Sequence, residues 1–377
     1  MIGEATVGHF EVERLGEGEG FMGDTARFHL DLVGAIPPDA PKTLVIKIPT
    51  SDRRLRGQGE ALGIYEREVF FYQELAPRLS VKMPRCYYAA MDPRPFGSPE
   101  RDAESFESLN RMPRFVFRLL MWLAPFLARL GRRRYVLLLE DLAPARLGDQ
   151  VSIASDADLL GATEALAQLQ GSCWQSREIE SLPWIHPICA LPRLTAFAYD
   201  RNRPHFEERF GDQLSDEIRS LLDWLSENVE QVFERVSRSP GTLIHGDYRL
   251  DNLFFDDRSG DRRPIIADWQ VPSWGSGLYD LAYFLTGSLD ENVIGEREQA
   301  LVRHYHEALV GAGVSDYSFE SCWADYGAAR LMVLMRMVST IAEIHPTNER
   351  AVQLFSSWVD RLTARVEGVK PEAWLTR

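Results

Sequence analysis

Alternating hydrophobic and polar positions dominate the first fifty residues of the chain. Residues 10–15, 26–33 and 43–48 are short runs with the two-residue period that is typical of β-strands. A glycine-rich turn separates the first two runs, and the proline-rich segment 36–41 precedes the third. The chain is therefore expected to open with a β-rich region.

The pattern then changes to helical spacing. Apolar side chains recur at intervals of three or four residues from Leu62 to Tyr72, which predicts a helix over residues 58–75 that ends before Pro77. We expect this to be the one major helix of an otherwise β-rich region.

Two further strands are predicted from the short apolar runs 86–90 and 135–139. The segment 94–134 between them is long for a connection, and we interpret it as an insertion. Helical patterns occupy residues 156–170, 214–236, 277–289, 296–310 and 324–344, with short β runs near 243, 253 and 265. This order predicts an α+β fold with a β-rich lobe at 1–140 and a mainly helical lobe at 141–377.

The composition limits the class of protein. The formal net charge of −14 argues against a nucleic-acid partner, because such a partner requires a basic surface. The four cysteines are scattered, which suggests neither a zinc site nor a disulfide framework and favours a reducing compartment. The N-terminus does not resemble a secretion signal, and no apolar run reaches about 18 residues, so we expect a cytoplasmic protein.

The strongest chemical signal is the motif HxDxxxxN, formed by His245, Asp247 and Asn252 and followed by Asp268. Phosphoryl transfer from ATP requires an aspartate beside the attacking hydroxyl and hard oxygen ligands for Mg²⁺. Asp247 suits the catalytic role, and Asn252 and Asp268 suit the metal. His245 is expected to support the loop. The alternative is that these are ordinary turn residues, but the motif with its matched aspartate is rare by chance.

These residues resemble a known family. The segments LIHGDYRLDN at 243–252, ADWQ at 267–270 and GLYDLAY at 277–283 are similar to the motifs of the aminoglycoside phosphotransferase and choline kinase superfamily. GFMG at 20–23, EVFFY at 68–72 and LEDL at 139–142 are nearest to its ecdysteroid-kinase-like bacterial branch. The resemblance covers about residues 12 to 290.

The resemblance implies a two-lobed, protein-kinase-like fold and an enzyme that moves the γ-phosphoryl group of ATP to a hydroxyl of a small molecule. Members of the superfamily differ widely in their acceptors, so the acceptor stays open. A protein kinase is disfavoured, because no Ala-Pro-Glu follows Asp268 and residues 269–280 are too few for an activation loop. The alternative is an inactive nucleotide-binding regulatory module with the same fold.

A kinase also needs a cation on the ATP phosphates. Lys47 is the candidate, because it lies in the apolar strand 44–48 as the lysine of the related VAIK motif does. Glu68 is expected to hold it, since it shares an inward helical face with Tyr65 and a buried glutamate requires a cation. Glu66 lies on a different face and is the alternative partner. An exposed edge lysine is the alternative for Lys47.

The glycine-rich segment 16–23 resembles the loop that covers the nucleotide. Glycines such as Gly18 and Gly20 let backbone amides approach phosphate closely. Glu17 and Glu19 depart from this pattern, because they repel phosphate unless they point outward. A flexible hairpin therefore stays open as the alternative.

Four further positions of interest lie in the linker and at helix ends. The resemblance implies that the backbone of Glu140 and Leu142, in the linker between the lobes, hydrogen-bonds the adenine edge. The alternative is that the acidic side chains of the linker, Glu140 and Asp141, are simply exposed to solvent. Asp280 begins an apolar helix and is expected to cap it. The family often has a histidine where this chain has Gln170, so no role is transferred to that position.

Segment 111–134 is unusual in an acidic protein, because it contains many arginines and no acid. An amphipathic helix with Arg, Trp, Phe and Leu is able to lie in a membrane interface, attracted by anionic lipids. A membrane contact would suit a hydrophobic alcohol as the acceptor. The alternative is that the segment packs on its own lobe or on a second subunit, with its arginines paired to surface carboxylates.

Overall fold

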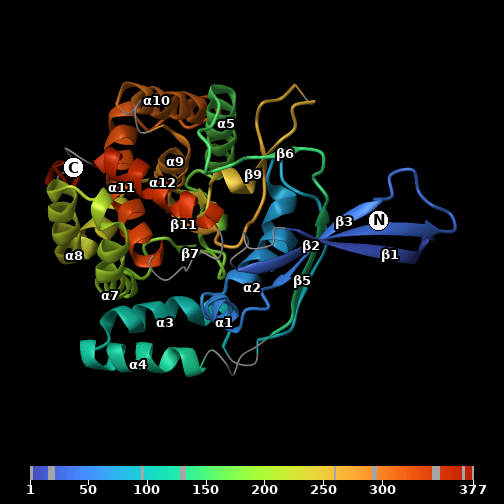
Figure 1. The fold of residues 1–377 in the computed structure, drawn as a ribbon, viewed down its shortest axis with the longest axis horizontal. Coiled ribbons are helices and arrows are strands. Elements are labelled where there is room, and N and C mark those ends of the chain that lie inside the picture. The colour runs from blue at the N-terminus through green and yellow to red at the C-terminus, as the bar shows by residue number, and fades with distance from the viewer. Residues whose placement is uncertain are drawn as a thin grey trace.

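The protein is described from a computed structural model, over residues 3–15, 22–94, 97–127, 133–258, 260–290, 295–341, 349–366 and 370–375. The strands of the first 140 residues gather at one end of the molecule and the helices that follow gather at the other (Figure 1). The α+β class and the two-lobed arrangement predicted from the sequence are confirmed.

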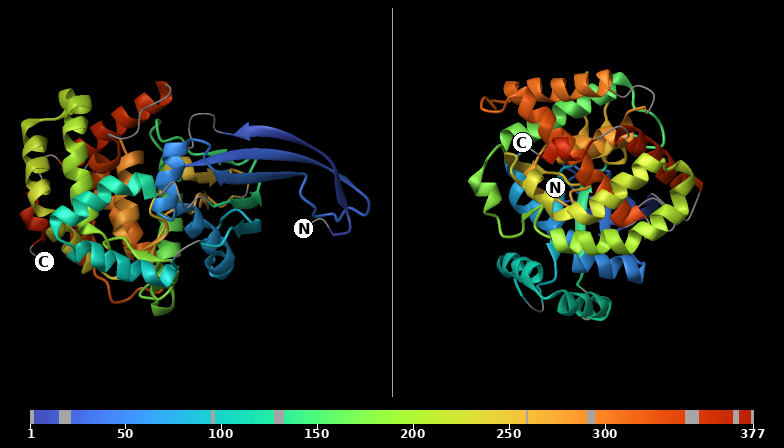
Figure 2. Two further views of the ribbon diagram at one scale, coloured as in Figure 1. Left: turned by 90° about the horizontal axis from the view of Figure 1, so that it is seen from below. Right: turned by 90° about the vertical axis from the view of Figure 1, so that its left-hand side faces the viewer.

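The N-terminal sheet has five antiparallel strands in the order β1-β2-β3-β5-β4. The strands are β1 Thr6–Leu15, β2 Gly23–Val33, β3 Thr43–Pro49, β4 Cys86–Met91 and β5 Tyr135–Glu140. Strand β1 is exposed along nearly its whole length, and with β2 it extends away from the helices (Figure 2). All five predicted strands are present, and each is slightly longer than its apolar run.

The helix predicted over residues 58–75 begins earlier and is interrupted. Helix α1 is Arg53–Ala61, because the side chain of Asp52 accepts hydrogen bonds from the amides of residues 54 and 55. Gly63, with a positive φ of 66°, then separates it from α2, Ile64–Phe70. A π-helical turn, Phe71–Leu75, and a 3₁₀ turn, Ala76–Arg78, complete the segment.

The insertion between β4 and β5 forms two helices, α3 Pro99–Arg111 and α4 Arg114–Leu127. They lie beneath α7 in Figure 1. The ring of Phe117 packs edge-on against Phe197 at 5.7 Å, and the side chain of Asn110 donates to the carbonyl of Ala190 at 2.7 Å. The insertion therefore packs on the helical lobe rather than on the sheet that it interrupts.

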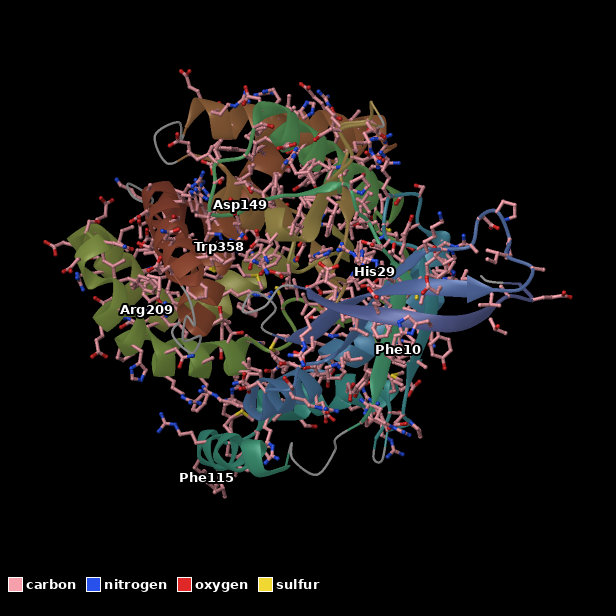
Figure 3. All side chains as sticks on the ribbon, turned by 45° about the vertical axis from the view of Figure 1, so that its right-hand side comes forward. Phe10, His29, Phe115, Asp149, Arg209 and Trp358 are labelled. Atoms are coloured by element: carbon pink, nitrogen blue, oxygen red, sulfur yellow. The ribbon has the colours of Figure 1, made fainter. Side chains whose placement is uncertain are left out.

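One face of α4 does not pack on the protein. Phe115 is 75% exposed and Leu119 is 55% exposed, and Phe115 points away from the body of the molecule in Figure 3. Arg118 lies on the same exposed side. Residues 128–132 of the unusual arginine-rich segment lie outside the described residues, whereas Arg133 and Arg134 pair with Glu66 and Asp92.

The C-terminal lobe is mainly helical. Its helices are α5 Asp156–Ser172, α6 Arg177–Glu180, α7 Pro192–Phe210, α8 Asp216–Ser237, α9 Leu278–Ser288, α10 Glu296–Gly311, α11 Phe319–Ile341, α12 Glu349–Val366 and α13 Glu372–Leu375, with 3₁₀ turns at Gly211–Gln213 and Leu250–Asn252. Its short strands are β6 Arg146–Leu147, β7 His186–Pro187, β8 Gly241–Ile244, β9 Leu253–Phe255, β10 Ile265–Ile266 and β11 Ser273–Ser276.

The core of this lobe is built around α9, in which every residue is buried. Helices α5, α11 and α12 pack against it. The helix predicted over 324–344 begins five residues earlier, and its predicted end lies outside the described residues. Within the part of the chain that the structure describes, no helix combines the length and apolar character that crossing a bilayer requires.

Candidate active site

A pocket of about 1100 Å³ lies between the N-terminal sheet and the catalytic loop. It brings together nearly all the predicted site residues, from both lobes: Lys47, Glu68, Glu140, Leu142, Asp247, Asn252 and Asp268. Gly18 and Gly20 lie outside the described residues, so the predicted phosphate-covering loop stays a prediction. Gly23, at the end of that loop, does line the pocket.

The catalytic loop connects β8 to β9 and has a tight backbone. Gly246 has φ +82°, and a Cβ atom added there would lie 2.3 Å from the carbonyl oxygen of Val271. Only glycine fits both the conformation and the space. The 3₁₀ turn Leu250–Asn252 then brings Asn252 back beside Asp247.

Asn252 and Arg249 hold the carboxylate of Asp247. The Asn252 amide nitrogen donates to the Asp247 carbonyl at 2.8 Å and to its Oδ2 at 3.0 Å, and Arg249 Nε donates to the same Oδ2 at 3.2 Å. Burial is the largest influence on Asp247 and would raise its pKa, but Arg249, Arg336 and a hydrogen bond from Tyr283 together lower the pKa. Asp247 is therefore an ionised carboxylate at neutral pH.

His245 is a buried support of this loop, as its position predicted. Its ring nitrogens lie 3.3 Å from the Asp247 amide and 3.0 Å from the Ala267 carbonyl oxygen. Burial lowers the pKa of His245, so the ring is neutral, with Nδ1 accepting and Nε2 donating. The imidazole thereby ties the loop to the segment that precedes Asp268.

Asp280 does not cap helix α9, and that prediction was wrong. The helix begins at Leu278 after Gly277, whereas the Asp280 carboxylate accepts the amides of His245 at 2.7 Å and Gly246 at 2.9 Å. Burial raises the pKa of Asp280 to about 7, although the two amide donors oppose that shift. Asp280 is still a structural support, but of the catalytic loop instead of its own helix.

Lys47 makes two short ion pairs. Its Nζ lies 2.7 Å from Glu68 Oε1 and 2.7 Å from Asp268 Oδ1. Burial, the largest influence on Lys47, would lower its pKa, but the two carboxylates outweigh burial and raise the pKa of the ammonium group. Burial also raises the pKa of Glu68, and the nearby charge of Asp268 adds to this while Lys47 opposes it.

Glu66, the alternative partner, faces elsewhere. Its carboxylate pairs with Arg94 at 2.5 Å and with Arg133 at 3.1 Å. The two glutamates thus point in the different directions that a helical spacing of two residues predicts. Of these two glutamates, only Glu68 contacts Lys47.

Asn252 and Asp268 suit a divalent metal. Asn252 uses its amide nitrogen for Asp247, so its oxygen faces no donor among the described residues. Asp268 uses Oδ1 for Lys47, which leaves Oδ2. The Ala267 amide donates to the Asn252 carbonyl at 2.9 Å, so the two side chains start from neighbouring backbone. Both line the same pocket, and their hard oxygens are the ligands that Mg²⁺ prefers.

The linker between the lobes is braced rather than freely solvated. Asp141 accepts Arg27 Nε at 2.8 Å and Nη2 at 3.2 Å, and Glu140 Oε2 accepts the amide of Arg85 at 3.1 Å. Glu140 and Leu142 both line the pocket. Their predicted adenine contacts stay a prediction.

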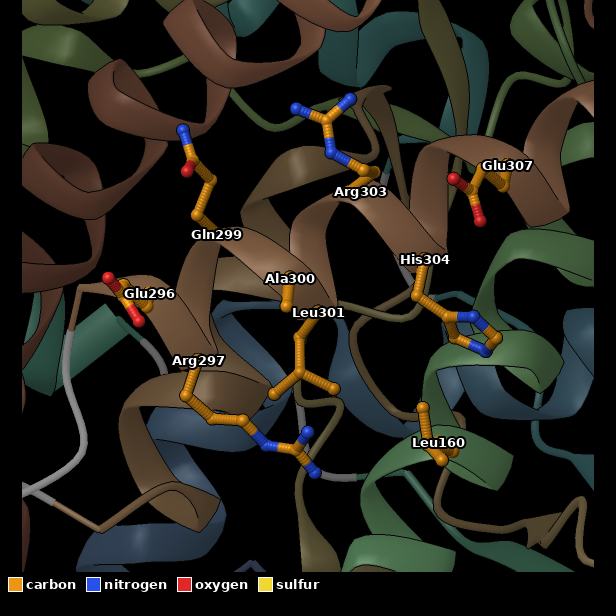
Figure 4. Close-up of a pocket in the computed structure, with 9 residues that line it drawn as sticks. All are labelled: Leu160, Glu296, Arg297, Gln299, Ala300, Leu301, Arg303, His304 and Glu307. Carbon is orange, nitrogen blue, oxygen red and sulfur yellow. The ribbon is translucent and has the colours of Figure 1, made fainter.

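A second hollow, of about 400 Å³, lies along α10 beside Leu160 of α5 (Figure 4). Its cations already have partners: Arg297 pairs with Asp156, His304 lies 3.1 Å from Glu164, and Arg303 stacks on Phe319. It contains none of the predicted site residues. The pocket at the catalytic loop is therefore the candidate active site.

Comparison with known proteins agrees with this geometry. The model of the ecdysteroid kinase-like family matches residues 193–313, which include the catalytic loop. A choline kinase from Cryptosporidium parvum Iowa II superposes with a TM-score of 0.53 at 11% identity, over 98% of this chain and 94% of that chain. The GDP complex of an aminoglycoside 2′-phosphotransferase-IIIa variant gives 0.52 at 14% identity, over 95% and 91%.

The chain has the fold of the small-molecule kinases. The superfamily resemblance seen in the sequence is thus confirmed. Shorter matches occur to "Probable acyl-CoA dehydrogenase IBR3" of Arabidopsis thaliana, 40% identical over 63 residues, and to human "Acyl-CoA dehydrogenase family member 11", 34% identical over 67 residues. These matches span 17% and 18% of this kinase-like chain, but only 7% and 8% of the two relatives.

Sequence reasoning missed several residues that shape the site. Trp269 is fully buried, stacks on Phe71 at 4.0 Å and packs at a tilt against His245 at 4.6 Å, so it joins the π-helical turn after α2 to the catalytic loop. Gln170 donates to Asp280 Oδ2 at 3.3 Å. For Trp269 the available signal was its position directly after Asp268. For Gln170 it was the histidine that the family often has at the same position, although no role could be transferred from it.

Proposed function

We propose that the protein is an ATP- and Mg²⁺-dependent kinase that transfers the γ-phosphoryl group to a hydroxyl of a small molecule. The observation that carries this is the convergence, in one pocket, of an ionised aspartate, a lysine held by two carboxylates, and two side chains with spare oxygens. These are the groups that phosphoryl transfer requires. The proposal extends the kinase-like fold to a specific reaction.

Asp247 would act on the acceptor. Its carboxylate hydrogen-bonds the acceptor hydroxyl, orients the oxygen toward the γ-phosphorus and takes the proton as the new O–P bond forms. The bond between the γ-phosphorus and the bridging oxygen breaks, and ADP leaves. Arg249 and Asn252 fix the Asp247 carboxylate for this task.

Lys47, Asn252 and Asp268 would act on the nucleotide. Lys47 places a positive charge at the pocket, and Glu68 keeps that ammonium group in position. Asn252 and Asp268 would hold Mg²⁺, which supplies charge neutralisation for the phosphates when it is bound. The adenine would lie against the linker at Glu140 and Leu142.

If the protein were an inactive nucleotide-binding module instead of a kinase, one experiment would give a different result. Nucleotide binding is measured with AMP-PNP and Mg²⁺, and ATP consumption is measured with a panel of hydroxylated compounds. Asp247→Asn should bind AMP-PNP as the wild type does but lose nearly all transfer, because the acceptor hydroxyl loses its base. Asp257→Asn, an exposed carboxylate outside the pocket, is the control. Equal consumption by wild type and Asp247→Asn would remove the catalytic role.

A further inference from the structure

Two arginines near the catalytic loop have no carboxylate partner. Arg67 projects from α2 and Arg336 from α11, so one comes from each lobe. Among the residues that the structure describes, neither guanidinium has an ion pair with an aspartate or glutamate. Other inward arginines are neutralised: Arg249 pairs with Asp247 and Asp251, and Arg133 pairs with Glu66.

Arg67 is the more poorly satisfied of the two. Its Nη2 donates to the Leu62 carbonyl at 3.1 Å, while its Nε is buried without any hydrogen-bond partner. Burial and, to a smaller extent, the positive charge of Arg336 lower the pKa of Arg67 to about 10, while the charge of Asp102 opposes this shift. A guanidinium has five N–H donors, and leaving them unpaired in the interior is costly.

Arg336 lies close enough to the catalytic aspartate for its charge to lower the pKa of Asp247. Its Cζ is 5.5 Å from the centroid of the Tyr279 ring, which stacks on Tyr283 at 6.1 Å. Tyr283 in turn hydrogen-bonds Asp247. Arg336 thus reaches the reacting region through the two tyrosines of α9, and its charge acts on Asp247 directly.

The nucleotide does not explain these cations. Neither Arg67 nor Arg336 lines the pocket that contains Lys47, Glu140 and Asp268. Asp247 lies between the nucleotide pocket and the region of Arg336. It lines that pocket, and its carboxylate also interacts with Arg336. A negative charge brought to Arg336 would not face a bare carboxylate, because Arg249 already lies 3.2 Å from Asp247.

We propose that Arg336, assisted by Arg67, binds an oxyanion carried by the acceptor, so that the substrate is a hydroxylated acid, either a carboxylate or a phosphate ester. The planar guanidinium fork matches the two oxygens of such a group. A cation–π contact with the Tyr279 ring helps to hold the Arg336 guanidinium in place. This inference rests on the proposed kinase function, and it adds a charge to the hydroxyl-bearing acceptor that the function requires.

The test measures anion binding without any need to know the substrate. Sulfate is titrated into full-length protein saturated with AMP-PNP and Mg²⁺, so that sulfate cannot occupy the nucleotide site, and binding is followed by calorimetry. We expect saturable binding to the wild type and an affinity at least about tenfold lower in Arg336→Gln, because the variant loses a charged hydrogen-bond donor to the anion. Arg67→Gln should weaken sulfate binding less than Arg336→Gln does, and Arg336→Lys should retain part of the wild-type affinity.

Arg303→Gln, on the exposed surface of α10, is the matched control and should bind sulfate as the wild type does. AMP-PNP affinity and the thermal melting temperature of each variant show whether it is folded. The inference is overturned if the wild type does not bind sulfate, or if Arg336→Gln binds sulfate with unchanged affinity. Failure of AMP-PNP to bind would instead count against the proposed function, so the two failures are distinguishable.

Matched acceptors then separate the two oxyanions. Hydroxy acids are compared with their methyl esters, and sugar phosphates with the free sugars, by ATP consumption. We expect a lower KM for the charged member of each accepted pair, and loss of that difference in KM in Arg336→Gln. Equal KM values for the two members of an accepted pair contradict the inference while leaving the kinase function intact.

Discussion

The side chain of Asn252 has two tasks within a single amide group. Its nitrogen fixes Asp247, and its oxygen is directed to no donor among the described residues. Asn252→Ala removes both tasks, so we expect about 10- to 100-fold slower transfer and a higher Mg²⁺ concentration for half-maximal activity. A Mg²⁺ titration of ATP consumption measures both quantities. An unchanged Mg²⁺ requirement would exclude Asn252 as a metal ligand.

Gly246 makes a second residue-scale prediction, which concerns stability alone. A methyl group there meets the Val271 carbonyl at 2.3 Å in a left-handed conformation. Gly246→Ala should therefore lower the free energy of unfolding by about 2 kcal/mol or more, as measured by urea denaturation. Gly57→Ala is the matched control. It lies in α1 with open space around it, so it should stabilise the protein by about 0.5–1 kcal/mol.

Residue types in the site were predictable where chemistry alone restricts them. Asp247, Asn252 and Asp268 follow from what phosphoryl transfer requires, and the pairing of Lys47 with Glu68 follows from helical and strand periodicity. The role of Asp280 was not predictable, because an aspartate near a helix start is compatible with capping. Its true partners are amides 34 and 35 residues earlier in the chain.

At the scale of elements, periodicity located the strands and most helices but not their interruptions. Helix α7 escaped prediction because Pro204 lies inside it and its apolar face is weakly marked. Gly63 divides the long helix of the N-terminal lobe, and no spacing argument reveals a left-handed residue. The insertion was recognised by its length, yet its packing on α7 depends on the tertiary contacts of Phe117 and Asn110.

Strand β7 carries a pH-sensitive residue where the insertion meets the helical lobe. The ring of His186 packs edge-on against Phe106 of α3 at 4.8 Å. Burial, assisted by Arg67, lowers the pKa of His186 from 6.5 to about 4. Between these values the unfolded chain binds a proton that the folded protein does not, so stability falls as the pH falls from about 6.5 to about 4.

His186→Phe removes this proton uptake and keeps an aromatic ring beside Phe106. When the pH is lowered from neutral to about 4, the free energy of unfolding should fall less in the variant than in the wild type. The difference between the two falls should be up to about 3 kcal/mol. Urea denaturation at the two pH values measures the difference. His9→Phe, on the exposed strand β1, should follow the wild type. Parallel losses in His186→Phe and the wild type would contradict the assignment.

At the scale of the whole molecule, the two lobes meet through groups that are far apart in the sequence. The contact of Lys47 with Asp268 spans 221 positions, and Phe71 stacks on Trp269 across a similar separation. The pattern of each segment predicts its own secondary structure, but not which buried rings meet. The order of the predicted elements indicated a β-rich and a helical lobe, and the resemblance to a family implied a kinase-like fold, but neither predicted these contacts between the lobes.

The surface of the molecule presents a contrast in charge. The chain carries a formal net charge of −14, yet the exposed side of α4 presents Phe115, Arg118 and Leu119. Phe117, on the other side of the same helix, is buried against α7. One face of α4 therefore packs on the helical lobe, whereas the membrane contact expected from the sequence stays a prediction for the exposed face.

We predict that this exposed face binds anionic membranes weakly and reversibly. Apolar side chains flanked by arginine gain free energy from both burial and the attraction of acidic lipids. Wild-type protein should co-sediment with vesicles that contain phosphatidylserine but not with vesicles of phosphatidylcholine alone, and raising the salt concentration should reduce binding. The double variant Phe115→Ser, Leu119→Ser should lose it.

The control for that experiment is Val310→Ser, which removes an exposed apolar side chain from α10 instead. It should co-sediment as the wild type does, since α10 lies on a different side of the helical lobe (Figure 1). Sedimentation velocity of the same variants distinguishes the remaining possibility. If the wild type dimerises and the double variant does not, while vesicle binding is absent in both, the exposed face of α4 joins two copies of the chain and the membrane prediction is wrong.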